Sequence, residues 1–130
     1  MSEHPNVTVI NRMTQAVFEN DREALATIFT DDLTFHVRGP LPRPGDHQGV
    51  DGFLDAMGAI FELTDGDVKI QQLFSMADGA WASEWERAHF GRNGKTLEAH
   101  DVFVYEFRGD RIADLWMICA APAGSEAFWD

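Results

Sequence analysis

Asp101 is the residue whose type and position could do chemistry, within the stretch "LEAHDVFVYEF" at residues 97–107. The β-branched and aromatic residues around it are typical of a strand, where a buried carboxyl group is costly. Alternation puts Asp101 on one face with Phe103 and Tyr105, and His100 on the other. In an apolar cavity its pKa would rise, and the protonated acid could donate a hydrogen bond to a carbonyl oxygen or enolate. The alternative is a structural Asp, paired with a cross-strand Arg or turned to solvent.

The partner of Asp101 depends on how its strand pairs with the preceding strand, "WASEWERAHF". A two-residue turn at Asn93 and Gly94 would place Glu86 opposite Asp101 and Glu84 two residues along the same face. Three carboxyl groups would then crowd one side of the sheet.

A three-residue loop ending at Gly94 would instead place Trp85 opposite Asp101, with Arg87 within diagonal reach. We favour this second register, because it buries Trp81 and Trp85 and leaves the two glutamates in solvent. Under it, Trp85 and Arg87 contact the ligand. The positive charge of Arg87 would lower the pKa of Asp101, against the effect of burial.

His36 is the candidate base, because imidazole accepts a proton near neutral pH. It belongs to a short strand at residues 33–37, where alternation places Phe35 and Val37 inside and His36 on the opposite face. Only a bulge or bend after this strand would turn His36 inward. A structural His on the outer face is the alternative.

The sequence predicts no metal site and no cofactor. No two His residues have the i, i+4 spacing of a helical metal site, and no tight cluster of His, Asp and Glu falls within one element. No Gly-rich loop follows a strand with the spacing of a phosphate cradle.

The elements that must position these residues follow from hydrophobic periodicity. Residues 6–29 carry a helical period that polar residues interrupt at 19–23, and a third helix is expected at 50–63. Strands are then expected at 68–76, 80–90, 97–107 and 111–119. This order predicts an α+β fold: a cone-shaped α+β barrel in which three N-terminal helices pack against a curved, mostly antiparallel sheet. We expect residues 1–130 to form a single domain.

The charge and composition of the sequence limit the kinds of molecule that this protein is expected to bind. The net charge of −12 and pI near 4.6 oppose binding to nucleic acids and to anionic membranes. The one cysteine, Cys119, allows no intramolecular disulfide, and the first residues lack the pattern of a signal peptide. We therefore expect a cytoplasmic protein.

The aromatic residues predict an apolar small-molecule ligand in the cone. Its expected contacts are Met13, Phe35, Val37, Trp85, Arg87, Phe103 and Met117. On the last strand Trp116 and Ile118 would form an apolar patch on the outer sheet face, which predicts a homodimer through that face.

Four segments resemble the SnoaL-like branch of the nuclear transport factor 2-like superfamily, which includes ketosteroid isomerases, limonene epoxide hydrolase and polyketide cyclases. They are "NDREALATIFTDDLTFHVRG", "HQGVDGFLDAM", "LEAHDVFVYEFRGDRIADLW" and "EAFWD". The resemblance implies the fold. Because the superfamily hosts unrelated reactions, it does not fix the function.

The resemblance also implies roles for particular positions. The proton-shuttling Asp of ketosteroid isomerases falls on Val37 and their oxyanion Tyr on Met13, so neither group is present. Their second oxyanion donor, a protonated carboxylic acid, falls on Asp101. The Asp-Arg-Asp set of limonene epoxide hydrolase is absent, since its positions fall approximately on Ala88, Glu86 and Met117.

Three hypotheses follow. The first is a cofactor-free enzyme that acts on an apolar carbonyl compound by isomerase, cyclase or hydratase chemistry, with Asp101 polarising the carbonyl and His36 as base. The second is a non-catalytic protein of the same fold that binds an apolar metabolite, which the apolar Val37 and Met13 favour. The third is a structural dimer with a filled core.

Overall fold

The computed structural model describes residues 4–120 and 123–130. Its helices are α1 (Pro5–Glu19), α2 (Arg22–Ile28), α3 (Gly49–Leu63) and α4 (Ser125–Trp129). Its strands are β1 (Phe29–Arg38), β2 (Gly45–Gln48), β3 (Val68–Asp78), β4 (Trp81–Arg92), β5 (Lys95–Arg108) and β6 (Arg111–Cys119).

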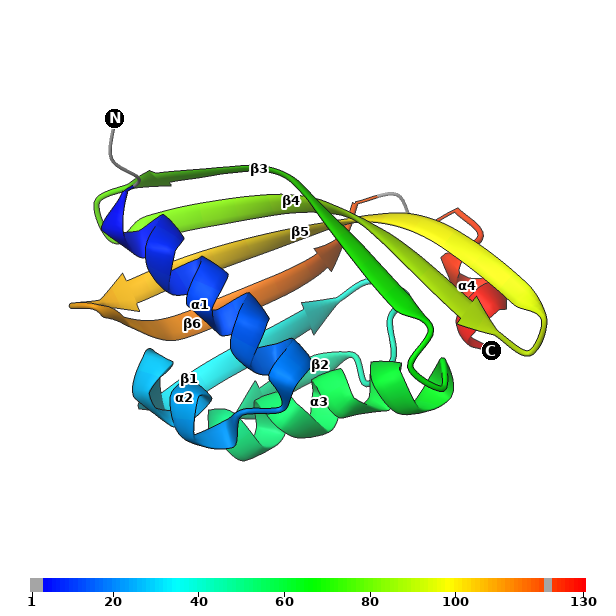
Figure 1. Ribbon diagram of the computed structural model, residues 1–130, viewed down its shortest axis with the longest axis horizontal. Helices are drawn as coiled ribbons and strands as arrows, with labels where there is room; N and C mark the ends of the chain where they lie inside the picture. The colour runs from blue at the N-terminus through cyan, green and yellow to red at the C-terminus, as the bar shows by residue number, and fades with distance from the viewer. Residues whose placement is uncertain (1–3, 121–122) are drawn as a thin grey trace.

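The six strands form one curved sheet in the order β2-β1-β6-β5-β4-β3. Only β1 and β6 run parallel, and the other neighbours are antiparallel. Helices α1, α2 and α3 lie on the concave side of this sheet (Figure 1). The predicted α+β class is confirmed. Within the described residues the sheet is not closed into a barrel, because β2 and β3 are its two edges.

The helices bury the faces that their periodicity predicts. Val9, Ile10 and Met13 of α1 are buried in the core. The polar interruption of the helical period separates α1 from α2, and the Asp21 carboxylate caps α2 by accepting a hydrogen bond from the backbone N–H of Ala24 at 3.1 Å.

Residues 45–48, where we predicted no strand, form β2. It pairs with the outer half of β1, from Val37 opposite Gly45 to Thr34 opposite Gln48. The prolines end before the paired residues begin, so that the backbone donors of β2 remain available to the sheet.

The register that we favoured for the β4–β5 hairpin is wrong. Asn93 and Gly94 have φ angles of 53° and 77°, which suits a two-residue turn between twisted strands. Glu86 therefore lies opposite Asp101, and Trp85 lies opposite Val102. The preference of Asn-Gly for this turn sets the pairing, and the tryptophans face outward.

The C-terminal helix α4 lies beside the end of the β4–β5 hairpin (Figure 1). Arg92 of β4 donates hydrogen bonds to the backbone carbonyls of Phe128 and Asp130, at 3.0 and 2.9 Å. The rings of Phe90 and Trp129 are 5.1 Å apart. These contacts hold the tail against the hairpin. None of the helices in the described residues is long and apolar enough to cross a membrane.

Candidate active-site cavity

A cavity lies between the concave face of the sheet and helices α1 and α3. Its volume is about 580 Å³ with the open mouth included, although the centre of a water molecule fits in only about 50 Å³ of it. The cavity is therefore narrow. It is lined by Met13, Thr14, Val17, Phe18, Phe53, Met57, Ile60, Phe61, Val68, Ile70, Glu84, Glu86, Phe90, Asp101, Phe103, Tyr105 and Met117.

Asp101 forms part of the deep wall of this cavity. Its side chain is 0% exposed, and neither carboxyl oxygen has a hydrogen-bond partner within the described residues. Burial raises the pKa of Asp101 to about 7, because the low-polarity surroundings penalise its charged form. The predicted inward orientation, on one face with Phe103 and Tyr105, is confirmed. Near neutral pH the group can act as donor or as acceptor.

Glu84 and Glu86 project from β4 into the same cavity and are buried. The pKa of Glu86 is raised to about 9, mainly by burial and then by the negative charge of Glu84, a hydrogen bond to Glu84 and the charge of Asp101. Burial also raises the pKa of Glu84, whereas hydrogen bonds from Glu86 and Gln72 oppose this rise. The arrangement favours a proton on Glu86, which donates to an ionised Glu84.

Gln72 of β3 fixes the outer member of this pair. Its side-chain amide donates to Glu84 Oε2 at 2.6 Å. A shallow groove between α1 and β3 reaches both Glu84 and Glu86 from outside and shares Thr14 with the wall of the cavity. The acid pair therefore lines both the cavity and this groove, which also share Phe18 and Ile70.

Tyr105 completes the polar wall. It is fully buried, and its hydroxyl has no hydrogen-bond partner in the described residues. Burial, followed by the charges of Glu84 and Glu86, raises the pKa of Tyr105 well above its ordinary value. The hydroxyl therefore stays protonated and can donate to a ligand.

The structure brings together only some of the residues that the sequence predicted for the site. Met13, Phe103 and Met117 line the cavity with Asp101. Phe35 and Val37 are buried in the core instead. The Phe35 ring packs 5.0 Å from that of Phe53, and Val37 pairs with β6.

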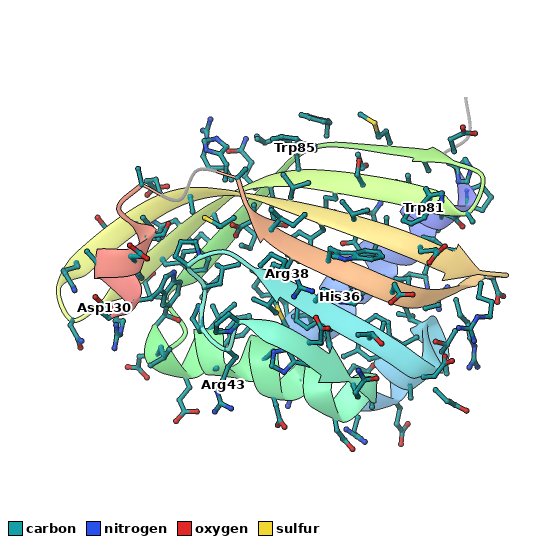
Figure 2. All side chains as sticks on the ribbon, turned by 180° about the vertical axis from the view of Figure 1, so that it is seen from behind. His36, Arg38, Arg43, Trp81, Trp85 and Asp130 are labelled. Atoms are coloured by element: carbon teal, nitrogen blue, oxygen red, sulfur yellow. The ribbon has the colours of Figure 1, made fainter. Side chains whose placement is uncertain are left out.

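His36 lies on the outer face of the sheet, as alternation along β1 predicts, and not in the cavity. Its Nδ1 is 3.0 Å from Asp46 Oδ1 and its Nε2 is 3.0 Å from Asp114 Oδ1. The imidazole also stacks on Trp116, with ring centroids 4.6 Å apart. Figure 2 shows His36 on the face turned away from α1. These contacts are structural, and they leave His36 unable to reach a group held at Asp101.

Trp85 and Arg87 also face outward, so their predicted contact with the cavity is wrong. Trp85 stacks on Phe74, with centroids 5.6 Å apart, and Arg87 is exposed. Trp85 and Trp81 both project from the outer face in Figure 2. The incorrect hairpin register is the sole cause, because a shift of one residue moves every side chain to the other face.

Because of the same error in register, we expected Glu84 and Glu86 in solvent, whereas both line the cavity. The signal that could have found them was the Asn-Gly turn, which is the strongest short-range indication of a two-residue hairpin. No group of three or more His, Cys, Asp or Glu residues in the described ranges is arranged to hold a metal ion.

This chain is similar to known proteins in both sequence and structure. The family model of the SnoaL-like domain matches residues 10–115. An uncharacterised protein of Mycobacterium tuberculosis is 27% identical over 99% of both chains. Among solved structures, Bal32a from a soil-derived mobile gene cassette has a TM-score of 0.87 at 24% identity, covering 97% of both chains. A protein of Jannaschia sp. CCS1, called a SnoaL-like polyketide cyclase, has a TM-score of 0.75 at 10% identity, covering 90% of this chain and 89% of its own.

Proposed function

We propose that this chain, which belongs to the SnoaL-like domain family, is a cofactor-free acid–base enzyme that acts on an apolar carbonyl compound. The observation that carries the proposal is the gathering of Asp101, Glu84 and Glu86 in one apolar cavity. Carboxyl groups whose surroundings separate their pKa values supply both an acid and a base at one pH.

The roles follow from the contacts of each group. Protonated Asp101 donates a hydrogen bond to the carbonyl oxygen of the ligand, where negative charge develops. Glu84 accepts hydrogen bonds from Gln72 and Glu86, which oppose the rise of its pKa on burial, so in this proposal it is the member of the pair that ionises and removes a proton from the carbon next to the carbonyl. The proton returns to another carbon in an isomerisation. In a cyclisation the enolate carbon attacks a second carbonyl in the same molecule.

This assignment moves the base from His36 to the Glu84–Glu86 pair. It keeps Asp101 in the role that the family resemblance implies. Phe103, Met117 and Met13 would contact the apolar body of the ligand, since they share the wall of the cavity with Asp101.

The exchange of α-protons with D2O, followed by proton NMR on a panel of small apolar ketones, tests the proposal. Asp101→Asn and Glu84→Gln should each slow exchange at least about tenfold, near 1.4 kcal/mol of barrier. His36→Ala is the control and should leave the rate unchanged. Wild-type rates in both cavity variants, or no exchange above background in the wild type, would refute the catalytic roles.

The alternative is a non-catalytic binding protein. It is favoured by the apolar Val37 and Met13, which occupy the positions where the isomerases carry a proton-shuttling acid and an oxyanion donor. A binding protein would show ligand-dependent increases in melting temperature without any proton exchange.

We also propose a homodimer through the outer sheet face. Phe74, Met76 and Trp81 are 48%, 58% and 49% exposed there, and Trp81 lies 6.0 Å from the ring of Trp116. An aromatic patch of this kind on a sheet favours association with a second copy.

A further inference from the structure

The charges that line the cavity are all of one sign. Glu84, Glu86 and Asp101 are its ionisable acids, and none of its described lining residues is Lys, Arg or His. The adjoining groove between α1 and β3 also has no basic residue in its described lining. An apolar cavity holding acids without a cation is electrostatically incomplete.

Some buried polar atoms of the cavity also lack a hydrogen-bond partner in the described residues. Both oxygens of fully buried Asp101 and the hydroxyl of Tyr105 are without partners in the described residues. A carbonyl oxygen satisfies a donor at Asp101, as the proposed function requires. It leaves Glu84 with hydrogen bonds from Gln72 and Glu86 and with no cation among the described lining residues of the cavity.

The mouth of the cavity suits an organic cation. Phe18 of α1 and Phe61 of α3 stand edge to face there, with ring centroids 5.6 Å apart, and Phe18 is half exposed. Aromatic rings attract ammonium groups through their negative faces. The net charge of −12 adds a long-range field that draws cations in and repels anions.

We propose that the cavity binds an apolar molecule bearing a protonated amine, with the ammonium group held by Glu84 and Glu86 on the inner side of the aromatic mouth. The inference rests on the proposed function for the location of the ligand, and it adds a second functional group to the substrate. The carbonyl lies deeper, at Asp101. Anionic substrates such as carboxylates and phosphate esters are excluded.

Binding of the ammonium group is coupled to protons. The groups that face it are Glu84 and Glu86 from β4 and Asp101 and Tyr105 from β5, whereas the lining residues of α1, α3 and β3 are not titratable. A bound cation stabilises the ionised carboxylates, so the protein releases a proton. Affinity should therefore increase from pH 6 to pH 8, and decrease once the amine itself loses its proton.

Titration calorimetry with a matched pair of probes, 4-phenylbutan-2-amine and 4-phenylbutan-2-one, tests this inference. At pH 7.5 the amine should bind at least about tenfold more tightly than the ketone. Repeating the titration in buffers of different ionisation enthalpy should reveal proton release. Glu84→Gln should weaken the amine at least about tenfold and leave the ketone unchanged.

Glu106→Gln is the matched control, because it removes the same charge from a residue that alternates to the outer face of β5. Melting curves verify that each variant folds, and Glu86→Gln is the second variant if Glu84→Gln does not. Ketone binding as tight as amine binding, or an equal effect of Glu106→Gln, would overturn the amine inference and leave the proposed function standing. If Asp101→Asn exchanges α-protons at the wild-type rate, the proposed function is overturned and the amine inference is not.

Discussion

Replacement of Asp101 by Asn should make the protein more stable at neutral pH and change how its stability depends on pH. The reason is the cost of ionising a carboxyl group that is 0% exposed and without a partner in the described residues. Asn has nearly the same shape and carries no charge, so the variant keeps the packing and removes the titration.

The sign follows from the direction of the pKa shift. Burial raises the pKa of Asp101 from 3.8 to about 7. Between these values the unfolded chain has lost the proton and the folded protein retains it, so the free energy of unfolding falls as pH rises. At about 1.36 kcal/mol per pKa unit, the shifted pKa of Asp101 lowers the free energy of unfolding by about 2 kcal/mol at pH 5 and by about 4 kcal/mol at pH 8.

Urea unfolding of the wild type and Asp101→Asn at pH 5, 6, 7 and 8 measures this difference. The stability of the variant relative to wild type should increase by roughly 2 to 3 kcal/mol from pH 5 to pH 8. Asp110→Asn, at an exposed turn position, controls for the loss of one negative charge. Parallel pH profiles of wild type and Asp101→Asn would refute the reasoning, because Asp101 would then titrate alike in both states.

Two further predictions concern the cavity wall and the outer face. Tyr105→Phe removes a buried hydroxyl that has no partner in the described residues. Urea unfolding should show a free energy of unfolding that is unchanged or higher by about 1 kcal/mol. A decrease larger than this amount would show that the hydroxyl is hydrogen-bonded. Trp81→Asp places a charge in the exposed aromatic patch. If the proposed dimer forms, size-exclusion chromatography with light scattering should show a dimeric wild type and a monomeric variant. A wild-type protein that is already monomeric would contradict the proposed interface.

The first two helices and the inward or outward orientation of strand residues could be predicted from the sequence, because each depends on a single periodicity. The helical period, broken by a polar segment, predicted α1 and α2, because each helix buries one stripe of its own residues. Val9, Ile10 and Met13 are buried as that period requires. Strand alternation likewise placed Asp101 inside and His36 outside, which is where the structure has them.

The candidate site was predicted incompletely where two principles competed. Turn chemistry at Asn93 and Gly94 favoured one hairpin register, and the hydrophobicity of Trp85 against Glu86 favoured the other. The structure follows the turn. Hydrophobicity misled because the outer face of this sheet carries exposed aromatic residues such as Trp81, while the inner face carries acids.

The inward glutamates are costly in a way that a purely structural role does not explain. Measured stabilities of domains are about 5–15 kcal/mol, and the pKa of about 9 at Glu86 adds to the cost at Asp101. Apolar residues of similar volume would pack such a cavity more stably than buried acids do. The hydrogen bond of Gln72 to Glu84 offsets only part of this cost. Local rules of burial are broken in this way where a protein binds or transforms a ligand, so the acids that weaken the fold are the groups around which the function should be sought.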